Sequence, residues 1–434
     1  MMPHHSSLRI FVLVDALGAA LPGVDALLPA VLPHRTALRT VLGFSSGAVP
    51  SLLTGLPPAE TGHWNLFYYN PAHSPFAWLR HWQFLPGRLR DHRVTRRLLK
   101  EAGRRWLGLG PLFECAVPPS LLPWFDWVEK KDIYAPGGIR GARSAFDDWE
   151  DEGLRYRIYT YRHAADAAIL QRAQAEVRAG AADVFFLYLS ELDHFLHFHR
   201  GEPAAIRQRL LWYGAELQAL FLAARQRDAE ARFCIFSDHG MAPVRGRTDV
   251  AGTVAGLGLE MPRDYLAVYD STMARFWFFN QRARHLVRSA LSEQPHGQLL
   301  RTEELRREGV FFPDHRFGET IFLLDPGWLI AESHFNGAGW NPTGMHGYHP
   351  DDADSDAIFL ANFEPAAKLG DIRDLHAILT GAPPRTIPAA RDAASPAVAA
   401  PVSATPAVAA SPAVAAPAVA TPVSAAPVSA VEAL

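Results

Sequence analysis

Short apolar runs alternate with longer segments of helical composition along much of the chain. Residues 9–14, 183–189 and 232–236 are continuous apolar runs of strand length, which is typical of strands buried on both faces of a sheet. Residues 165–179 and the amphipathic segment 202–227 have the composition of helices. This alternation predicts an α/β fold with a mostly parallel central sheet and helices on both faces.

Two segments interrupt this alternation, and a third has a different composition. Residues 64–150 are rich in aromatics and proline, and residues 263–335 have a less regular order, so we interpret both as possible cap insertions in a catalytic domain at 6–380. Residues 388–434 consist almost entirely of Ala, Pro, Val, Ser and Thr, which predicts a disordered tail.

Any single aromatic residue of the first insertion is expected to pack in the core of the cap itself, because large aromatics usually serve packing. The aromatics in question are Trp64, Phe67, Tyr68, Tyr69, Trp78, Trp82, Trp124 and Trp127.

Charge and cysteine content narrow the classes of partner and compartment. The net charge of −3 offers no electrostatic basis for binding nucleic acid or an anionic membrane. Cys115 and Cys234 are the only cysteines, and Cys234 lies in an apolar run, which argues against a disulfide-built secreted protein. The apolar run at 9–14 is too short to span a membrane and does not have the pattern of a signal peptide. We therefore expect a cytoplasmic protein without a membrane span.

Side chains that can bind metal ions follow the predicted strands. In an open α/β sheet, ligands bind where strands end and loops begin. A cluster of carboxylates and imidazoles at this edge is typical of a Zn²⁺ site. The residues at these positions, together with a histidine in a glycine-rich stretch near the end, are Asp15, Asp193, His197, Asp238, His239 and His346.

The spacing between Asp193 and His197 places both side chains on one face if the segment is helical. His194 and His199 lie in the same predicted loop and are either supporting groups or exposed residues.

Asp238 and His239 follow a buried strand directly, a position that is costly for polar groups unless they bind something. Gly240 would permit the tight turn that this arrangement needs, and the glycines beside His346 would let the backbone approach a ligand closely. His349 is a weaker candidate, and the acidic residues after it are expected to form a solvated loop.

Ser45 precedes an apolar helical segment that ends at Gly55. At a helix N-terminus, free N–H groups and the helix dipole favour an anion, which suits a serine that receives a phosphoryl group. The alternative is an ordinary N-cap serine.

The order of these motifs resembles the alkaline phosphatase superfamily, and most of all the type I phosphodiesterase/nucleotide pyrophosphatase family, from Asp15 to Phe363. In that family the nucleophile lies ten residues before the glycine of a Thr-Gly pair, which selects Ser45 rather than Ser46. The remaining matches are the motifs Asp-x-x-Gly-His at 193–197, with Leu196 in place of the glycine, Asp-His-Gly-Met at 238–241 and Gly-x-His-Gly-Tyr at 344–348.

The resemblance implies hydrolysis of a small-molecule phosphoric ester through a phosphoseryl intermediate, with two divalent metal ions, usually zinc. It implies that one ion is held by Asp193, His197 and His346. It implies that the other is held by Asp15, Asp238 and His239, with Ser45 bridging towards it.

Three departures from the family pattern, one of which is Leu196 at the glycine position, leave the type of ester open. Ala48 stands where the family commonly has a phosphate-binding Asn, and Asn65 matches a second family Asn further along the chain. Ser46-Gly47 replaces the usual Phe-Pro after the nucleophile. Hydrolysis of a phosphodiester or pyrophosphate is the leading hypothesis. The alternatives are a phosphomonoesterase, a phosphonate hydrolase, a phosphoryl transferase, and a non-catalytic ligand-binding member.

Overall fold

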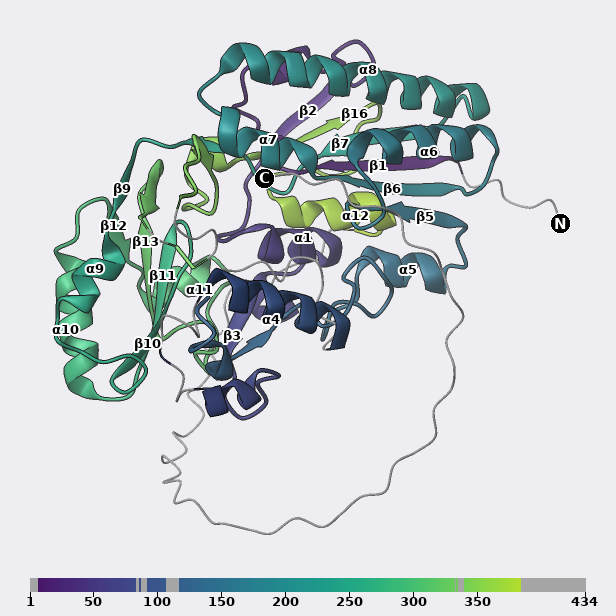
Figure 1. Ribbon diagram of the computed structural model, residues 1–434. Coiled ribbons are helices and arrows are strands. Elements are labelled where there is room, and N and C mark those ends of the chain that lie inside the picture. The colour runs from purple at the N-terminus through teal and green to yellow at the C-terminus, as the bar shows by residue number, and fades with distance from the viewer. Residues whose placement is uncertain are drawn as a thin grey trace, which may run out of the picture. The chain divides into compact units, whose positions relative to one another are not determined.

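Figure 1 presents a computed structural model of the chain, which describes residues 7–82, 86, 92–106, 117–331, 333–334 and 339–383. The predicted tail at 388–434 and Cys115 lie outside the described residues. Within the described part, no helix has the length and apolar character needed to cross a membrane.

The core of the fold is a six-stranded sheet with the order β2-β16-β7-β1-β6-β5. β1 pairs in parallel with β6 and with β7, and β5 pairs in parallel with β6, whereas β16 is antiparallel to both of its neighbours. The predicted α/β fold with a mostly parallel central sheet is therefore confirmed. The strands are β1 (Arg9–Val14), β2 (His34–Leu38), β5 (Tyr156–Tyr159), β6 (Val184–Leu189), β7 (Arg232–Phe236) and β16 (Ala357–Ala361).

Alternate residues of β1 contact the two helical layers. Ile10 and Val12 belong to the core on the side of α6 (Asp166–Arg178) and α8 (Pro203–Arg227). Phe11 and Leu13 belong to the core on the opposite side, which holds α1 (Ser45–Thr54), α5 (Ala145–Asp151) and α12 (Leu375–Thr380). Figure 1 shows these two layers above and below the sheet. Burial on both faces of the sheet explains why β1 is a continuous apolar run and does not alternate between apolar and polar residues.

A second, antiparallel sheet has the order β10-β11-β13-β12. Three short strand pairs, β3–β4, β8–β15 and β9–β14, complete the described β-structure. These strands are β3 (Phe67–Tyr69), β4 (Phe125–Trp127), β8 (Ala242–Pro243), β9 (Gly246–Thr248), β10 (Tyr265–Tyr269), β11 (Met273–Phe278), β12 (Gly297–Leu299), β13 (Thr320–Leu324), β14 (Trp328–Ile330) and β15 (Gly344–Met345).

The remaining helices lie between these strands in the sequence, except for one 3₁₀ helix that follows β16. The α-helices are α2 (Pro58–Thr61), α4 (Arg93–Trp106), α7 (Glu191–His199), α9 (Val250–Ala255), α10 (Gln281–Ser292) and α11 (Thr302–Arg307). Short 3₁₀ helices occur at Val24–Ala26, Ala77–Trp82, Leu122–Trp124, Ala353–Ser355 and Ile372–Asp374.

The two predicted insertions share one hydrophobic core. Phe67 and Trp127 of the first segment pack with Leu266 and Trp277 of the second sheet. Arg275 of the second sheet is fully buried, and its guanidinium donates to the backbone carbonyl of Phe67 at 3.0 Å. Most of the aromatics singled out from the sequence therefore pack inside this region, as expected. The cap role and the domain limits stay predictions.

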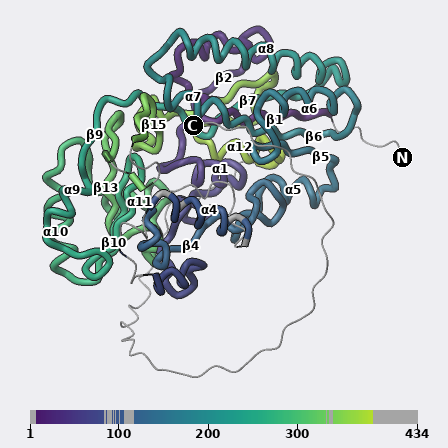
Figure 2. The backbone as a smooth tube through the Cα atoms, viewed as in Figure 1, coloured from purple at the N-terminus to yellow at the C-terminus, as the bar shows by residue number. Residues whose placement is uncertain are grey.

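The strands of the central sheet bring distant segments of the chain together. β1 lies between β6 and β7 (Figure 2), and because both pairings are parallel, the carboxyl ends of all three strands meet at one edge of the sheet. The loop after β7 passes close to the segment before β16. An added Cβ at Gly240 would lie 2.2 Å from the carbonyl oxygen of Asp354 and 2.8 Å from that of Asp356. Gly240 does not have a positive φ, so close packing explains this glycine better than the tight turn inferred from the sequence.

Gly240→Ala is expected to destabilise the fold by at least ~1–3 kcal/mol, because the methyl group would displace the segment before β16. Gly201→Ala is the matched control, since a Cβ there meets no atom within 4 Å. The free energy of unfolding from urea denaturation measures both effects. Equal values for the two variants would contradict the close packing around Gly240.

Candidate active site

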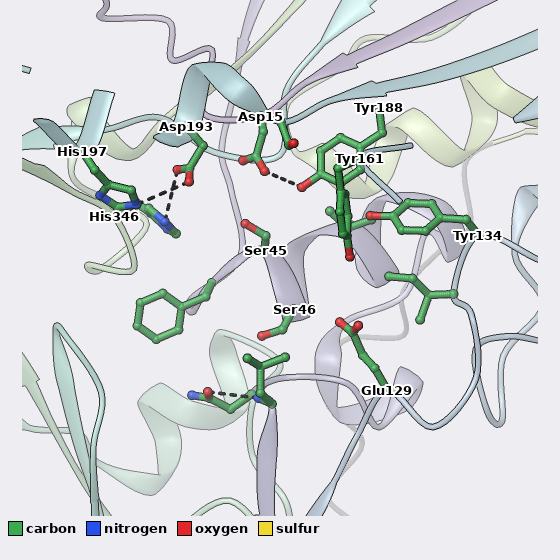
Figure 3. A pocket seen from close by; sticks show the side chains of 16 residues that line it. Asp15, Ser45, Ser46, Glu129, Tyr134, Tyr161, Tyr188, Asp193, His197 and His346 are labelled. Carbon is green, nitrogen blue, oxygen red and sulfur yellow. Dashed lines mark hydrogen bonds and ion pairs between the residues drawn. The ribbon is translucent and has the colours of Figure 1, made fainter. Parts of the chain in front are cut away.

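The structure brings all seven predicted catalytic and metal-binding residues to one edge of the central sheet. Figure 3 shows five of them, Asp15, Ser45, Asp193, His197 and His346. Asp15 follows β1, Asp238 and His239 follow β7, Asp193 and His197 lie on α7, His346 follows β15, and Ser45 is the first residue of α1. Their roles in catalysis stay predictions, but their convergence is a property of the fold.

Asp193 and His197 lie on a helix, so the prediction that they lie in a loop after β6 is wrong. α7 begins at Glu191, two residues after the end of β6. The i, i+4 spacing places both side chains on one face, and His197 Nε2 lies 3.4 Å from Asp193 Oδ2. Leu196, which replaces the family glycine, is fully buried in the core.

The other histidines of these motifs do not line the cavity that contains Ser45. His194 packs against Phe198, and His199 stacks on Phe195. His349 lies 3.6 Å from Glu304 in an ion-pair cluster. All three histidines therefore pack or pair with residues around the site and do not face the cavity.

The acidic segment after His349 is tied to the fold by ion pairs. Asp351 pairs with Arg39 at 2.8 Å, and Asp354 pairs with Arg200 at 2.9 Å. The Asp351 side chain is nevertheless exposed, as expected for a solvated loop, whereas that of Asp354 is only partly exposed.

A hydrogen bond joins Ser45 to His239, with 2.9 Å between Ser45 Oγ and His239 Nε2. His239 Nδ1 lies 2.9 Å from the carbonyl oxygen of Gly240, which can only accept. In the neutral imidazole the proton is therefore on Nδ1, and Ser45 donates its hydroxyl proton to Nε2. This arrangement leaves Nε2 of His239 as the atom that faces the site.

His197 is fixed in the same way. Its Nδ1 donates to the carbonyl oxygen of Gly344 at 2.9 Å, so in the neutral imidazole Nε2 carries no proton and faces Asp193. His346 Nε2 lies 3.5 Å from Asp193, and its ring stacks on that of His239 at 3.9 Å between centroids. A backbone carbonyl that fixes the ring tautomer is the usual support of a metal-binding histidine.

The carboxylates of the site are buried with incomplete hydrogen bonding. Asp238 is fully buried, and neither of its carboxylate oxygens has a hydrogen-bond partner among the described residues. The same holds for one oxygen each of Asp15 and Asp193, and for Nδ1 of His346. Buried polar atoms without partners are costly, so these atoms require a ligand.

The donor atoms form two groups, each within 4.8 Å. One consists of Asp15, Asp238 and His239, as the resemblance implied. The other consists of Asp193, His239 and His346, with His239 where His197 was expected. His197 remains in contact with Asp193, so the side chains of both groups are oxygen and nitrogen ligands of the kind that Zn²⁺ takes.

Burial and mutual proximity shift the titration of these groups. Burial raises the pKa of Asp15 well above its usual range, and the nearby Asp238 and Asp193 raise it further. Burial also opposes ionisation of Asp193, but His197 and His346 hold the pKa of this carboxyl below its ordinary value. The pKa of His346 is lowered well below its ordinary value by burial and by His239. Burial opposes protonation of His197, but Asp193 raises the pKa of this imidazole above its ordinary value, so the two groups favour each other's charged forms where no cation is bound.

Ser45 is positioned by contacts between α1 and Trp64. Ser46 Oγ donates to the carbonyl oxygen of Trp64 at 3.1 Å, and an added Cβ at Gly47 would lie 3.1 Å from that oxygen. The close approach explains the sequence Ser46-Gly47 at this point. Ala48, at the expected Asn position, is buried in the hydrophobic core.

Asn65 lines the same cavity as Ser45. Its side-chain nitrogen donates to Asp270 at 3.3 Å, and its side-chain oxygen accepts from the backbone N–H of Leu66. These contacts hold the amide in one orientation at the wall of the site.

Sequence reasoning missed the residues that line the rest of the cavity, which has a volume of about 470 Å³. They are Tyr188, near the end of β6, Tyr161, two residues after β5, and Tyr134 and Glu129 from the first insertion. Tyr188 donates a short hydrogen bond to Asp15. The strand-end rule that found Asp15 also points to Tyr188 and Tyr161, whereas Glu129 has no such signal.

Glu129 is a buried acid at the opposite end of the cavity from the histidines (Figure 3). Its closest charged partner is Arg162, with 3.6 Å between Nη2 and Oε2. Burial raises the pKa of Glu129 to about 7, although Arg162 opposes this shift.

Comparison with known proteins gives a family match and a set of similar folds. The type I phosphodiesterase/nucleotide pyrophosphatase family model matches residues 44–349. No curated protein matches the sequence. The structure of human ectonucleotide pyrophosphatase/phosphodiesterase 5 has 14% sequence identity and a TM-score of 0.60, over 86% of this chain and 94% of that chain.

The murine protein of the same name is similar to the same degree, with 16% identity and a TM-score of 0.60 over 86% of this chain and 94% of that chain. An inactive variant of the murine protein in complex with AMP has 16% identity and a TM-score of 0.59, over 87% of this chain and 94% of that chain. At these identities, the likeness establishes the fold.

Glu129→Gln is expected to gain stability over the wild type as pH rises. The folded protein holds the proton of Glu129 up to about pH 7, against an ordinary value of 4.5, so ionisation of this group costs stability across that interval. The advantage of the variant should be about 1 kcal/mol at about pH 5 and approach about 3 kcal/mol at about pH 8.

Urea denaturation at both pH values measures this difference. Glu60→Gln, which removes an exposed carboxylate in a separate cavity, is the control and should show no such trend. A pH-independent difference between Glu129→Gln and the wild type would contradict the buried environment of this acid.

Proposed function

The chain belongs to the type I phosphodiesterase/nucleotide pyrophosphatase family and is a phosphoric ester hydrolase, and we propose that it uses Ser45 and two divalent metal ions, most suitably Zn²⁺, to cleave phosphodiesters or pyrophosphates. The observation that carries this proposal is the set of unpartnered carboxylate oxygens around Ser45 and His239.

The residues present fit two metal ions. Asp15, Asp238 and His239 would hold one, and Asp193, His197 and His346 would hold the other, with His239 close enough to contribute to either. Bound divalent ions lower the pKa of a coordinated hydroxyl and stabilise the charge on the oxygens of phosphate. Neutral imidazoles with free Nε2 atoms and ionised carboxylates are the protonation states that such binding requires.

Ser45 supplies the nucleophile in this proposal. Its Oγ lies at the N-terminus of α1, where the helix dipole favours the negative charge of a phosphoryl group. Attack of Oγ on phosphorus would break the bond to the leaving alcohol or phosphate and form a phosphoseryl ester. Water would then cleave this ester and restore the hydroxyl. The contact with His239 orients Oγ towards the cavity before the reaction.

The shape of the cavity favours a diester over a monoester. The space extends from Ser45 past Ser46 to Tyr134 and Glu129, and its volume of about 470 Å³ is in the range of small-molecule sites. A phosphoryl group bound at Ser45 would leave this space for a second ester group. Ala48 contributes no polar group to the site, and Asn65 is the amide that lines it.

Ser45→Ala is expected to reduce kcat for bis-p-nitrophenyl phosphate, assayed with added Zn²⁺ or Mn²⁺, by at least ~10³-fold, because the nucleophile is removed. Metal content, measured by elemental analysis, should stay near that of the wild type. Ser46→Ala is the matched control and should retain activity within about tenfold, since Ser46 contacts a backbone carbonyl.

Full activity of Ser45→Ala would overturn the assignment of the nucleophile. A wild-type protein that binds no divalent metal, or that a chelator does not inhibit, would overturn the metal-dependent mechanism. Faster turnover of p-nitrophenyl phosphate than of the diester would favour a phosphomonoesterase.

Tyr188→Phe is expected to weaken metal binding by about 10–100-fold, because the phenol hydroxyl holds Asp15 through a hydrogen bond. Competitive titration with a zinc chelator measures this affinity. Tyr213→Phe is the matched control, since it removes a buried phenol that donates to Asp166 on the other side of the central sheet and does not line the cavity. Unchanged affinity in Tyr188→Phe would show that this hydrogen bond does not position Asp15 for the metal.

A further inference from the structure

The end of the cavity that lies furthest from the histidines has polar groups directed into it. Figure 3 shows the carboxyl of Glu129 and the hydroxyls of Tyr134 and Tyr161 pointing towards one another across this space, with Ser45 and Ser46 between them and the metal-binding side chains. All these residues line the same cavity. A second group attached to a phosphate at Ser45 would therefore meet these polar atoms.

These polar atoms have unused hydrogen-bonding capacity. Among the described residues, the carboxylate of Glu129 accepts no hydrogen bond, and its ion pair with Arg162 is long, at 3.6 Å. The Tyr134 hydroxyl likewise has no partner in the part of the chain that the structure describes, although the residue is almost completely buried. Both groups line the cavity, so a ligand bound there can donate to the carboxylate and pair with the phenol.

The charges around Glu129 do not favour a cationic ligand. Arg162 lies between Glu129 and Asp132, with 3.2 Å between its Nη1 and Asp132 Oδ1. A positive charge already lies beside the carboxylate, so a second cation in the cavity would be repelled by Arg162. A neutral group with hydroxyl donors would satisfy the carboxylate without this repulsion.

The arrangement of the tyrosines does not favour a planar base. Tyr134 and Tyr161 pack edge to face at 6.3 Å, and Tyr161 and Tyr188 do so at 5.5 Å. Rings that contact one another in this way do not form a pair of parallel faces between which a base could stack. Tyr134 leaves its hydroxyl for the ligand, whereas the Tyr188 hydroxyl is already used on Asp15.

We propose that this end of the cavity binds a neutral, hydroxyl-rich alcohol of the glycerol or sugar type, esterified to the phosphate that reacts at Ser45. Glu129 accepts hydrogen bonds from two of its hydroxyls, and the Tyr134 hydroxyl contributes a third contact. This inference rests on the proposed function and names the class of diester that the enzyme selects. Glu129 and Tyr134 are substrate-positioning residues, remote from the reacting phosphorus.

The test compares four phosphodiesters that share p-nitrophenol as leaving group and differ in the second alcohol: glycerol, methanol, choline and thymidine. With the full-length metal-loaded enzyme, kcat/KM for the glyceryl ester should exceed that for the methyl ester by about tenfold or more, the worth of hydrogen bonds to a charged group. Glu129→Gln should remove about tenfold from the glyceryl ester alone, through KM, and leave the methyl ester unchanged.

Tyr134→Phe keeps the ring and should lower kcat/KM by about threefold for the glyceryl ester but not for the methyl ester. This variant tests the inference if Glu129→Gln does not fold. Glu60→Gln, an exposed carboxylate in a separate cavity, is the control and should leave all four esters unchanged.

The ester that the enzyme prefers identifies the kind of group that this end of the cavity binds. A preference for the choline ester that Glu129→Gln abolishes would replace the polyol with a cation, and a preference for the thymidine ester would replace it with a nucleoside. Turnover of the methyl ester without any preference for the glyceryl ester would overturn this inference but not the hydrolase. Loss of turnover for all four esters in the wild type would overturn the proposed function, and the inference with it.

Discussion

The proximity of three carboxylates at one edge of the central sheet is the constraint on which the rest of the site depends. Asp15 and Asp238 are buried beside each other, and Asp193 is close enough to raise the pKa of Asp15. Negative charges that are buried this close together are unfavourable unless a positive charge lies between them. Each neighbouring feature either reduces this cost or prepares the site for a cation that removes it.

The central sheet enforces this proximity through its register. Val14 pairs with Leu189 and Leu13 pairs with Phe236, so the segments that follow β1, β6 and β7 leave the sheet at the same level. The carbonyl oxygens of Gly240 and Gly344 then fix the tautomers of His239 and His197. Backbone atoms, which substitution of side chains does not remove, thus determine which imidazole nitrogens face the carboxylates.

The region around the second sheet contributes rigidity to the opposite wall of the cavity. The buried guanidinium of Arg275 pairs with Asp270 at 2.8 Å, and Asp270 in turn accepts from Asn65, which lines the site. A chain of buried, charge-assisted contacts therefore connects the second sheet to the wall beside Ser45. Together with Glu129 and the tyrosines, this wall sets the space available to a substrate, while the sheet edge sets the chemistry.

The sequence by itself determined the α/β architecture and the candidate metal-binding residues, because burial on both faces of a strand and polar groups at strand ends are local properties of the chain. The choice of Ser45 came from the family resemblance. Only the tertiary structure placed His239 between both donor groups, buried Ala48 in the core, and brought Glu129 to the cavity of Ser45. These relations depend on packing between segments far apart in the chain. Periodicity records whether a residue is buried, but it carries no information on which distant residue it meets.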